Sequence, residues 1–177
     1  MTPVRHVHAP LRLLLAVLAC MVCGPSLADN APVVATAAPT VAIGGEVATP
    51  LRLDAAVLSK LPRQRLEASA HGVSGTWEGV TLVEVLRAAG VPVGDKLRGA
   101  NLMLYVRIGA TDGYQVVYAL AELDPGFRDA RVILADTRDG KPLDAKEGPF
   151  RLVAADEKRP GRWVRNVQTI DVLRAPK

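Results

Sequence analysis

Histidine and cysteine, two residue types suited to acid–base and metal chemistry, are scarce in this chain. Of the three histidines, His6 and His8 lie near the N-terminus, in a stretch that is typical of a signal peptide, which leaves His71. A single histidine excludes every metal site that needs two or more of them. His71 is therefore a lone ligand, a general base or a hydrogen-bond donor to a cofactor, or else a loop histidine without a role. Cys20 and Cys23 lie in the same N-terminal stretch, so the rest of the chain has neither a thiol nor a disulfide.

Other common site patterns find no support in the sequence. The acidic residues are scattered over predicted turns and do not match a calcium-binding loop. Gly72 and Gly75 stand in a glycine-rich stretch that lacks the lysine and hydroxyl residue of a phosphate loop. Ser69 and Ser74 have no second histidine and no nucleophile-elbow context, so serine hydrolysis is not indicated. Nothing points to the paired carboxylates of a glycosidase.

The remaining candidates each have a structural reading beside a functional one. Asp112 opens an Asp-Gly pair, which is first of all a turn signal, and Tyr114 is equally well explained as a half-buried strand residue. Arg159, Arg162 and Arg165 follow one another at intervals of three residues. Taken alone, these three arginines form an ordinary solvated basic turn.

The N-terminal stretch predicts export to the periplasm. Arg5 and Arg12 are accompanied by no acid, and the apolar run over residues 11–22 is too short for a comfortable membrane span. A Gly-Pro pair ends this run, and small residues then lead to Ala28, after which we predict cleavage. An uncleaved membrane anchor is the alternative. The twin-arginine pair that directs the export of folded proteins is absent.

Composition indicates one globular domain after a short leader. The formal net charge of the 177 residues is +4, and loss of Arg5 and Arg12 with the signal peptide lowers it to +2. This near-neutral charge gives no reason to expect a nucleic-acid partner. We predict a signal peptide over residues 1–28, a flexible Ala- and Pro-rich leader over 29–40 and a single domain over 41–174.

Apolar runs separated by turn signals predict a strand-rich domain. Asp112-Gly113-Tyr114 and Asp139-Gly140 are the strongest turns, and residues 71–76 are predicted to form a glycine-rich loop. The predicted strands cover residues 41–47, 63–70, 101–108, 114–119, 131–135, 147–153 and 162–173.

Two helices carry local start signals. Asp54 is suited to cap a short helix over residues 55–61. Thr81 and Glu84 have the spacing of a capping box, and Gly90 is suited to end the helix that follows. This second helix has one apolar stripe, formed by Leu82, Val85, Leu86 and Ala89.

Several of these segments together resemble the sulfite-oxidase-type molybdopterin-binding domain family. The chain has the "DGY" turn at residues 112–114, "DGxPL" at 139–143 and "GPxRLV" at 148–153. Residues 77–91 (WEGVTLVEVLRAAGV) closely resemble the family's "W-x-GV-x-L-x-x-LL-x-x-AGV" element. The resemblance covers approximately residues 41–173. It implies an α+β fold, with a mixed, curved β-sheet and a few short helices, and molybdopterin as the family's cofactor.

The resemblance also implies basic residues that bind the cofactor. The family has a lysine in its last strand, and Arg165 occupies that position, with Arg162 just before it. Arginine binds phosphate through two parallel hydrogen bonds, so the exchange is compatible with phosphate binding. Arg151 matches a family arginine. Its alternative role is a buried ion pair with Asp112 or Asp136.

The same resemblance exposes a missing metal ligand. Catalytic family members bind molybdenum through a cysteine thiolate in the segment that corresponds to residues 66–71, where this chain has no cysteine. A hydroxyl group does not replace a soft thiolate ligand. His71 would lie at the mouth of the family's pocket, and Asp112 and Tyr114 on its cofactor side.

Two functional hypotheses follow. In the first, the chain is an exported, oxidoreductase-like domain that binds a pterin cofactor or a small anion through His71, Arg162 and Arg165, and exchanges electrons with a membrane-bound partner. In the second, it is a cofactor-free periplasmic binding, accessory or sensory module that reuses the fold. The missing cysteine argues against a molybdenum centre, and the sequence does not decide whether the chain is an enzyme.

Overall fold

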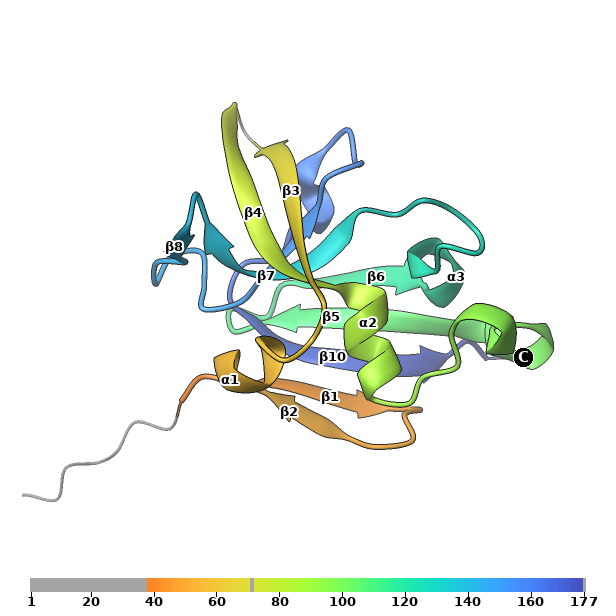
Figure 1. The fold of residues 1–177 in the computed structure, drawn as a ribbon. Coiled ribbons are helices and arrows are strands. Elements are labelled where there is room, and N and C mark those ends of the chain that lie inside the picture. The colour runs from red at the N-terminus through yellow and green to blue at the C-terminus, as the bar shows by residue number, and fades with distance from the viewer. Residues whose placement is uncertain (1–37, 71, 177) are drawn as a thin grey trace, which may run out of the picture. The chain divides into compact units, whose positions relative to one another are not determined.

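The structure is a computed structural model that describes residues 38–70 and 72–176 (Figure 1). The predicted signal peptide, most of the predicted leader and His71 lie outside the described residues. The described part contains ten strands, three short α-helices and three 3-10 helices. The predicted α+β class is therefore confirmed, and the strands are divided between two sheets.

The first sheet, sheet A, is mixed and has the strand order β2-β1-β10-β5-β6. β1 runs parallel to β10, with Ala42 opposite Thr169, and the other neighbours are antiparallel. Its strands are β1 (Val41–Gly45), β2 (Leu51–Leu53), β5 (Leu104–Ala110), β6 (Gln115–Ala119) and β10 (Val167–Arg174).

The second sheet, sheet B, is antiparallel and centres on β7, which pairs with β4 on one side and with both β8 and β9 on the other. β3 pairs with β4 at the outer edge. Its strands are β3 (Arg63–Ala70), β4 (Val73–Thr81), β7 (Val132–Arg138), β8 (Lys141–Pro142) and β9 (Arg151–Ala154).

Helix α2 (Leu82–Ala88) forms where its local signals predict it. The Thr81 hydroxyl accepts a hydrogen bond from the Glu84 backbone amide at 3.4 Å. The Glu84 carboxylate does not complete a capping box, because it pairs with Arg87 at 2.9 Å. Gly90 has a φ of +76°, the left-handed conformation that glycine adopts at helix C-termini. The two other α-helices are α1 (Ala55–Leu58) and α3 (Leu120–Leu123).

The predicted glycine-rich loop over residues 71–76 was wrong, because β4 already begins at Val73. Gly75 lies opposite Ala68 in the β3–β4 hairpin. A Cβ atom on Gly75 would lie 2.8 Å from the Arg138 Nε atom. The glycine therefore serves the close approach of a neighbouring side chain within a sheet.

Several predicted element boundaries also needed correction. The predicted helix 55–61 ends at Leu58, after which amide groups bond three residues back in place of four. Residues 101–103 belong to a 3-10 helix, so β5 starts at Leu104. Strands β9 and β10 start later than predicted, because residues 147–150 and 163–166 form the turns that lead into them.

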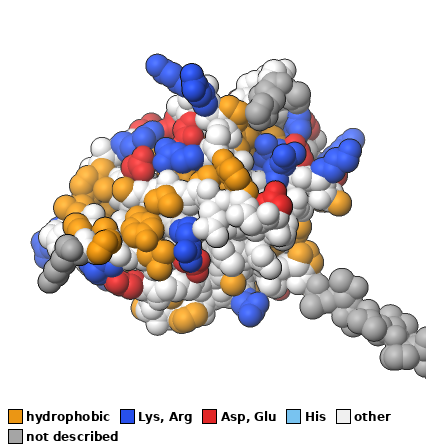
Figure 2. Space-filling model, turned by 180° about the vertical axis from the view of Figure 1, so that it is seen from behind, with side chains coloured by type: hydrophobic (Ala, Val, Ile, Leu, Met, Phe, Trp, Pro, Cys, Tyr) orange, Lys and Arg blue, Asp and Glu red, His pale blue; other side chains and the backbone are white. Residues whose placement is uncertain are grey.

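One apolar core joins both sheets and α2. Buried Leu86, Ile108, Leu134 and Ile170 belong to it, as does Phe150, which precedes β9. On the face shown in Figure 2, basic and acidic side chains are interspersed with apolar ones. Within residues 38–70 and 72–176, no helix is long and apolar enough to cross a membrane.

Candidate functional site

Residues from separate strands and turns line one depression of about 230 Å³, which we call the arginine depression. Strands β3, β4, β7 and β9 contribute residues to it, together with the segment between the 3-10 helix Pro160–Arg162 and β10. The lining residues are Ala70, Trp77, Arg138, Glu147, Arg151, Pro160, Trp163 and Arg165.

The register of sheet B brings these residues together. Trp77 of β4 is paired with Arg138, the last residue of β7. Arg151, the first residue of β9, is paired with Ala135 on the other side of the same strand. Side chains that are up to 74 positions apart in the sequence therefore face one another across β7.

Two tryptophans hold the guanidinium groups in place. The Trp77 and Trp163 rings meet edge to face, with centroids 5.8 Å apart and planes at 88°. The Arg151 guanidinium lies 4.8 Å from the Trp77 centroid and 5.5 Å from that of Trp163, and Arg138 lies 5.0 Å from Trp77. Such cation–π contacts fix the orientation of the guanidinium groups.

One carboxylate is shared by two of these arginines. Glu147 lies 2.5 Å from Arg151 Nη1 and 3.4 Å from Arg138 Nη1. Burial lowers the pKa of Arg151, Glu147 opposes this effect, and the charges of Arg165 and Arg138 lower it further. Arginine stays charged in proteins, so the depression concentrates positive charge.

Buried donors in the depression lack acceptors. The Trp77 Nε1 and Arg151 Nε atoms are buried and have no hydrogen-bond partner among the described residues. Trp77 is only 2% exposed. The Arg138 Nε atom lies 3.4 Å from Asp139 without hydrogen-bond geometry. Because buried donors are normally satisfied, an acceptor for these groups has to come from outside the described residues, and a ligand reaches them only when the surrounding side chains move.

A second depression of about 360 Å³ adjoins the first and shares Pro160, Trp163 and Arg165 with it. Two predicted site residues, Asp112 and Tyr114, line it. The Asp112 carboxylate accepts the Tyr114 backbone amide at 2.9 Å, and the Tyr114 hydroxyl donates to the Gly161 carbonyl at 2.5 Å. Both residues thus fix the turn and the wall of this depression.

Arg162 lines neither depression. Its guanidinium contacts Glu157 at 2.7 Å and Glu122 at 3.5 Å, and lies 3.9 Å from the Tyr118 centroid. Burial, together with Glu157, raises the pKa of Tyr118 far above its ordinary value. Arg162 therefore fastens the 3-10 turn to β6 and α3. The structure brings Arg151, Arg165, Asp112 and Tyr114 together, but not Arg162.

The alternative role of Arg151, a buried ion pair, is confirmed, but its partner is Glu147 and not Asp112 or Asp136. Sequence reasoning also missed Trp77, Arg138 and Glu147 as site residues. The chain has only two tryptophans, and both line the arginine depression. The scarcity of tryptophan could have indicated that these two residues belong to the site, whereas nothing in the local sequence marks Arg138 or Glu147.

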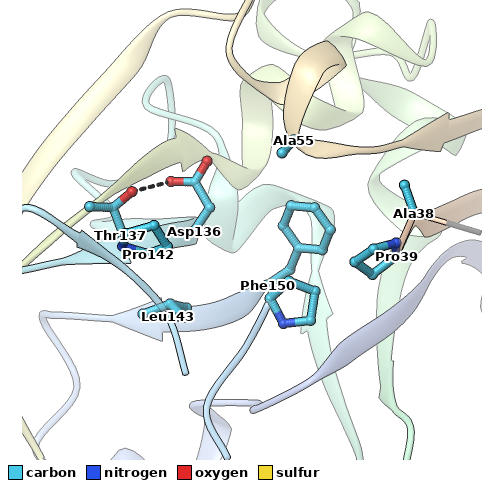
Figure 3. Close-up of a pocket in the computed structure, with 9 residues that line it drawn as sticks. Ala38, Pro39, Ala55, Asp136, Thr137, Pro142, Leu143 and Phe150 are labelled. Carbon is cyan, nitrogen blue, oxygen red and sulfur yellow. Dashed lines mark hydrogen bonds between the residues drawn. The ribbon is translucent and has the colours of Figure 1, made fainter. Parts of the chain in front are cut away.

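A separate pocket beside Phe150 is mostly apolar (Figure 3). Its carboxylate, Asp136, is occupied by Arg63 at 2.6 and 3.1 Å and by the Thr137 hydroxyl at 2.8 Å. Leu143 and Pro39 contribute to the remaining apolar wall. Among the described residues that line it, this pocket presents no unpaired charged group to a ligand.

The described residues do not fit a thiolate-bound molybdenum centre. The segment in which the family resemblance places the thiolate runs along β3, and its residue at the wall of the arginine depression is Ala70. Within the described ranges there is also no group of three or more His, Cys, Asp or Glu residues that could hold a metal. The arginines and the Trp77 donor fit a phosphate-type anion.

Comparison with known proteins supports the family resemblance and the fold. A family model described as oxidoreductase molybdopterin binding domain matches residues 29–177. No curated protein matches the chain significantly.

Among solved structures, the chain is similar to the crystal structure of the sulfane dehydrogenase SoxCD from Paracoccus pantotrophus. The TM-score is 0.58 and the sequence identity is 20%. The match covers 76% of this chain and 38% of the SoxCD chain, so this chain spans well under half of that protein. At this identity the similarity supports the fold.

Proposed function

This chain belongs to the oxidoreductase molybdopterin binding domain family, and on that premise we propose that it binds a phosphate-type anion without a thiolate-bound molybdenum. The anion is either the phosphate of a pterin ligand or a free oxyanion. Arg138, Arg151 and Arg165 would bind it. Arg162, which we predicted as a ligand from the sequence, is left out because its guanidinium is engaged elsewhere.

The observation that carries this proposal is that three arginines line one depression, where two of them share the Glu147 carboxylate, next to a buried indole donor that has no partner among the described residues. Guanidinium groups bind oxyanions through charge-assisted hydrogen bonds, often two at a time. Arg151 is held between two tryptophan rings, so little side-chain entropy is lost when it binds a ligand. Fixed donors of this kind favour a small, highly charged anion.

The test uses the intrinsic fluorescence of Trp77 and Trp163, since both rings line the depression. Sulfate is titrated into the protein at constant ionic strength, with sodium chloride as the balancing salt. We expect saturable binding that Arg165→Ala weakens about tenfold or more. Arg65→Ala is the matched control, because Arg65 is also an exposed arginine and pairs with Glu78 outside the depression. Equal sulfate affinity in the two variants would contradict the proposal.

The source of the anion is tested separately. The mature protein is purified from a host that makes molybdopterin, denatured, and assayed for released pterin fluorescence. Stoichiometric pterin would identify the anion as a pterin phosphate. Pterin-free protein that binds sulfate would identify a free oxyanion, and would favour the binding or sensory module over the redox enzyme.

We also propose that the chain acts in the periplasm beside a membrane-bound redox or sensor partner. The N-terminal sequence supports export, and the missing thiolate position supports a role that depends on binding. Cell fractionation followed by N-terminal sequencing tests both the location and the cleavage after Ala28. Cross-linking in intact cells tests for the membrane partner.

A further inference from the structure

We propose that the Glu147 carboxylate is an internal competitor of the ligand anion, and that it selects dianions over monoanions at the arginine depression. This inference rests on the proposed function. It concerns a residue that neither the sequence motifs nor the family match assigns to a site.

The Glu147 carboxylate already occupies two arginines of the depression. Its two carboxylate oxygens contact Arg151 Nη1 at 2.5 Å and Arg138 Nη1 at 3.4 Å. These are two of the guanidinium groups that face the depression. A ligand anion that binds both of them must share or replace the Glu147 contacts.

The backbone of Glu147 is fixed independently of its side chain. Its amide donates to the Asp144 carboxylate at 3.0 Å, and its carbonyl accepts from the Asn166 amide at 3.2 Å. Neither bond involves the Glu147 carboxylate. The side chain can therefore release the guanidinium groups by rotation while the turn stays in place.

There is also space for the displaced carboxylate. Glu147 and Arg138 line both the arginine depression and a third depression, which includes Lys141 and Asp144. Their ion pair thus separates the two depressions. A released Glu147 side chain would turn toward the third depression, where Lys141 offers a positive charge beside the carboxylates of Asp139 and Asp144.

Competition of this kind discriminates by charge. A monoanion such as formate offers the arginines the same group that Glu147 already supplies. Replacing the Glu147 carboxylate by formate therefore gains little binding free energy. A dianion such as sulfate carries twice the charge and more acceptor oxygens, which the exposed Arg165 and the Trp77 donor can also use. The carboxylate therefore raises the charge that a ligand needs in order to bind.

The test compares wild type, Glu147→Gln and the control Glu46→Gln by tryptophan fluorescence at constant ionic strength. Glu46 pairs with Arg174 at 2.6 Å and does not line the depression. We expect Glu147→Gln to bind sulfate about tenfold more tightly and to acquire measurable formate binding, because the competing charge is gone. Glu46→Gln should match wild type for both anions.

The outcomes separate this inference from the proposed function. If wild type binds sulfate through Arg165 and Glu147→Gln binds it no more tightly, Glu147 is not a competitor and the proposed function stands. If only Glu147→Gln binds, the competition by Glu147 is supported, but the proposed function of the wild-type chain is overturned. If neither binds, both are overturned. Should Glu147→Gln fail to fold, Glu147→Asp replaces it. The shorter aspartate side chain cannot contact both arginines, so sulfate binding should tighten about threefold. Unchanged affinity in that variant would refute the competition.

Discussion

The two tryptophans of the chain allow a matched test of the geometry of the depression. Trp77 and Trp163 are 2% and 7% exposed, and their rings contact each other. Trp77 has two guanidinium groups over its ring and Trp163 has one, and the two indole nitrogens differ in their hydrogen bonding. The Trp163 Nε1 atom donates to the Ala154 carbonyl at 2.9 Å, whereas the Trp77 Nε1 atom has no partner among the described residues. Substitution by phenylalanine removes each donor and keeps an aromatic ring.

The expected magnitudes follow from these contacts. Both substitutions remove buried ring atoms, and this cost is similar for the two. Trp163→Phe also loses a hydrogen bond worth about 1 kcal/mol, a modest figure because the Ala154 carbonyl still accepts from the Glu157 amide at 3.3 Å. Trp77→Phe instead removes a buried unpaired donor, whose burial costs about 1–3 kcal/mol. Trp163→Phe should therefore be about 2 kcal/mol or more less stable than Trp77→Phe.

Urea denaturation followed by circular dichroism measures the free energies of unfolding of both variants. In the presence of sulfate, Trp77→Phe should also lose the ligand's contact with the indole, so its stabilisation by sulfate should be smaller than that of wild type. Equal free energies of unfolding for the two variants would refute the assignment of Trp77 Nε1 as a donor held for a ligand.

Three further predictions concern separate contacts. Gly75→Ala places a Cβ atom 2.8 Å from Arg138 Nε, so it should displace this guanidinium and weaken sulfate binding several-fold. Isothermal titration calorimetry would measure the change. An unchanged affinity would show that Arg138 does not bind the anion. Burial works to raise the pKa of Asp136, but hydrogen bonds from Arg63 and Thr137 outweigh it and hold that pKa below its ordinary value. The stability that this ion pair contributes is present above the unfolded pKa and is lost as the pH falls through the lower folded pKa. In urea, the stability advantage of wild type over Asp136→Asn should therefore shrink below about pH 4. A difference in free energy of unfolding that is constant with pH would contradict the ion pair with Arg63. Arg162→Ala should lower the melting temperature, because Glu157, Glu122 and Tyr118 lose a shared partner. It should leave the sulfate affinity within about twofold of wild type. A large loss of affinity would show that Arg162 does bind the anion.

Much of the fold was predictable where its signals are local. Helix α2 starts at the Thr81 cap and ends before Gly90 as predicted, since capping depends on residues within one turn. The glycines of β4 were misread as a loop, because the reason for Gly75 is a side chain 63 positions later in the sequence. Propensity alone cannot report such a neighbour.

The site was predictable to a similar extent. Spacing within the family motifs pointed to Arg151 and Arg165, and both line the depression. Arg162 lies only three residues from Arg165, but the short 3-10 turn directs its side chain toward β6. Arg138 joins the site through the register of β7 with its neighbours, which no local pattern specifies. Glu147 joins it from the turn before β9, where it pairs with Arg151.

We propose above all that this family member has an anion site that operates without a thiolate-bound molybdenum. The most direct measurement is elemental analysis for molybdenum, per mole of folded mature protein, after expression in a host that makes the cofactor. We predict far less than one molybdenum per chain, in protein that still binds sulfate through Arg165. One molybdenum per chain, retained through purification, would contradict the claim and show that another group replaces the thiolate.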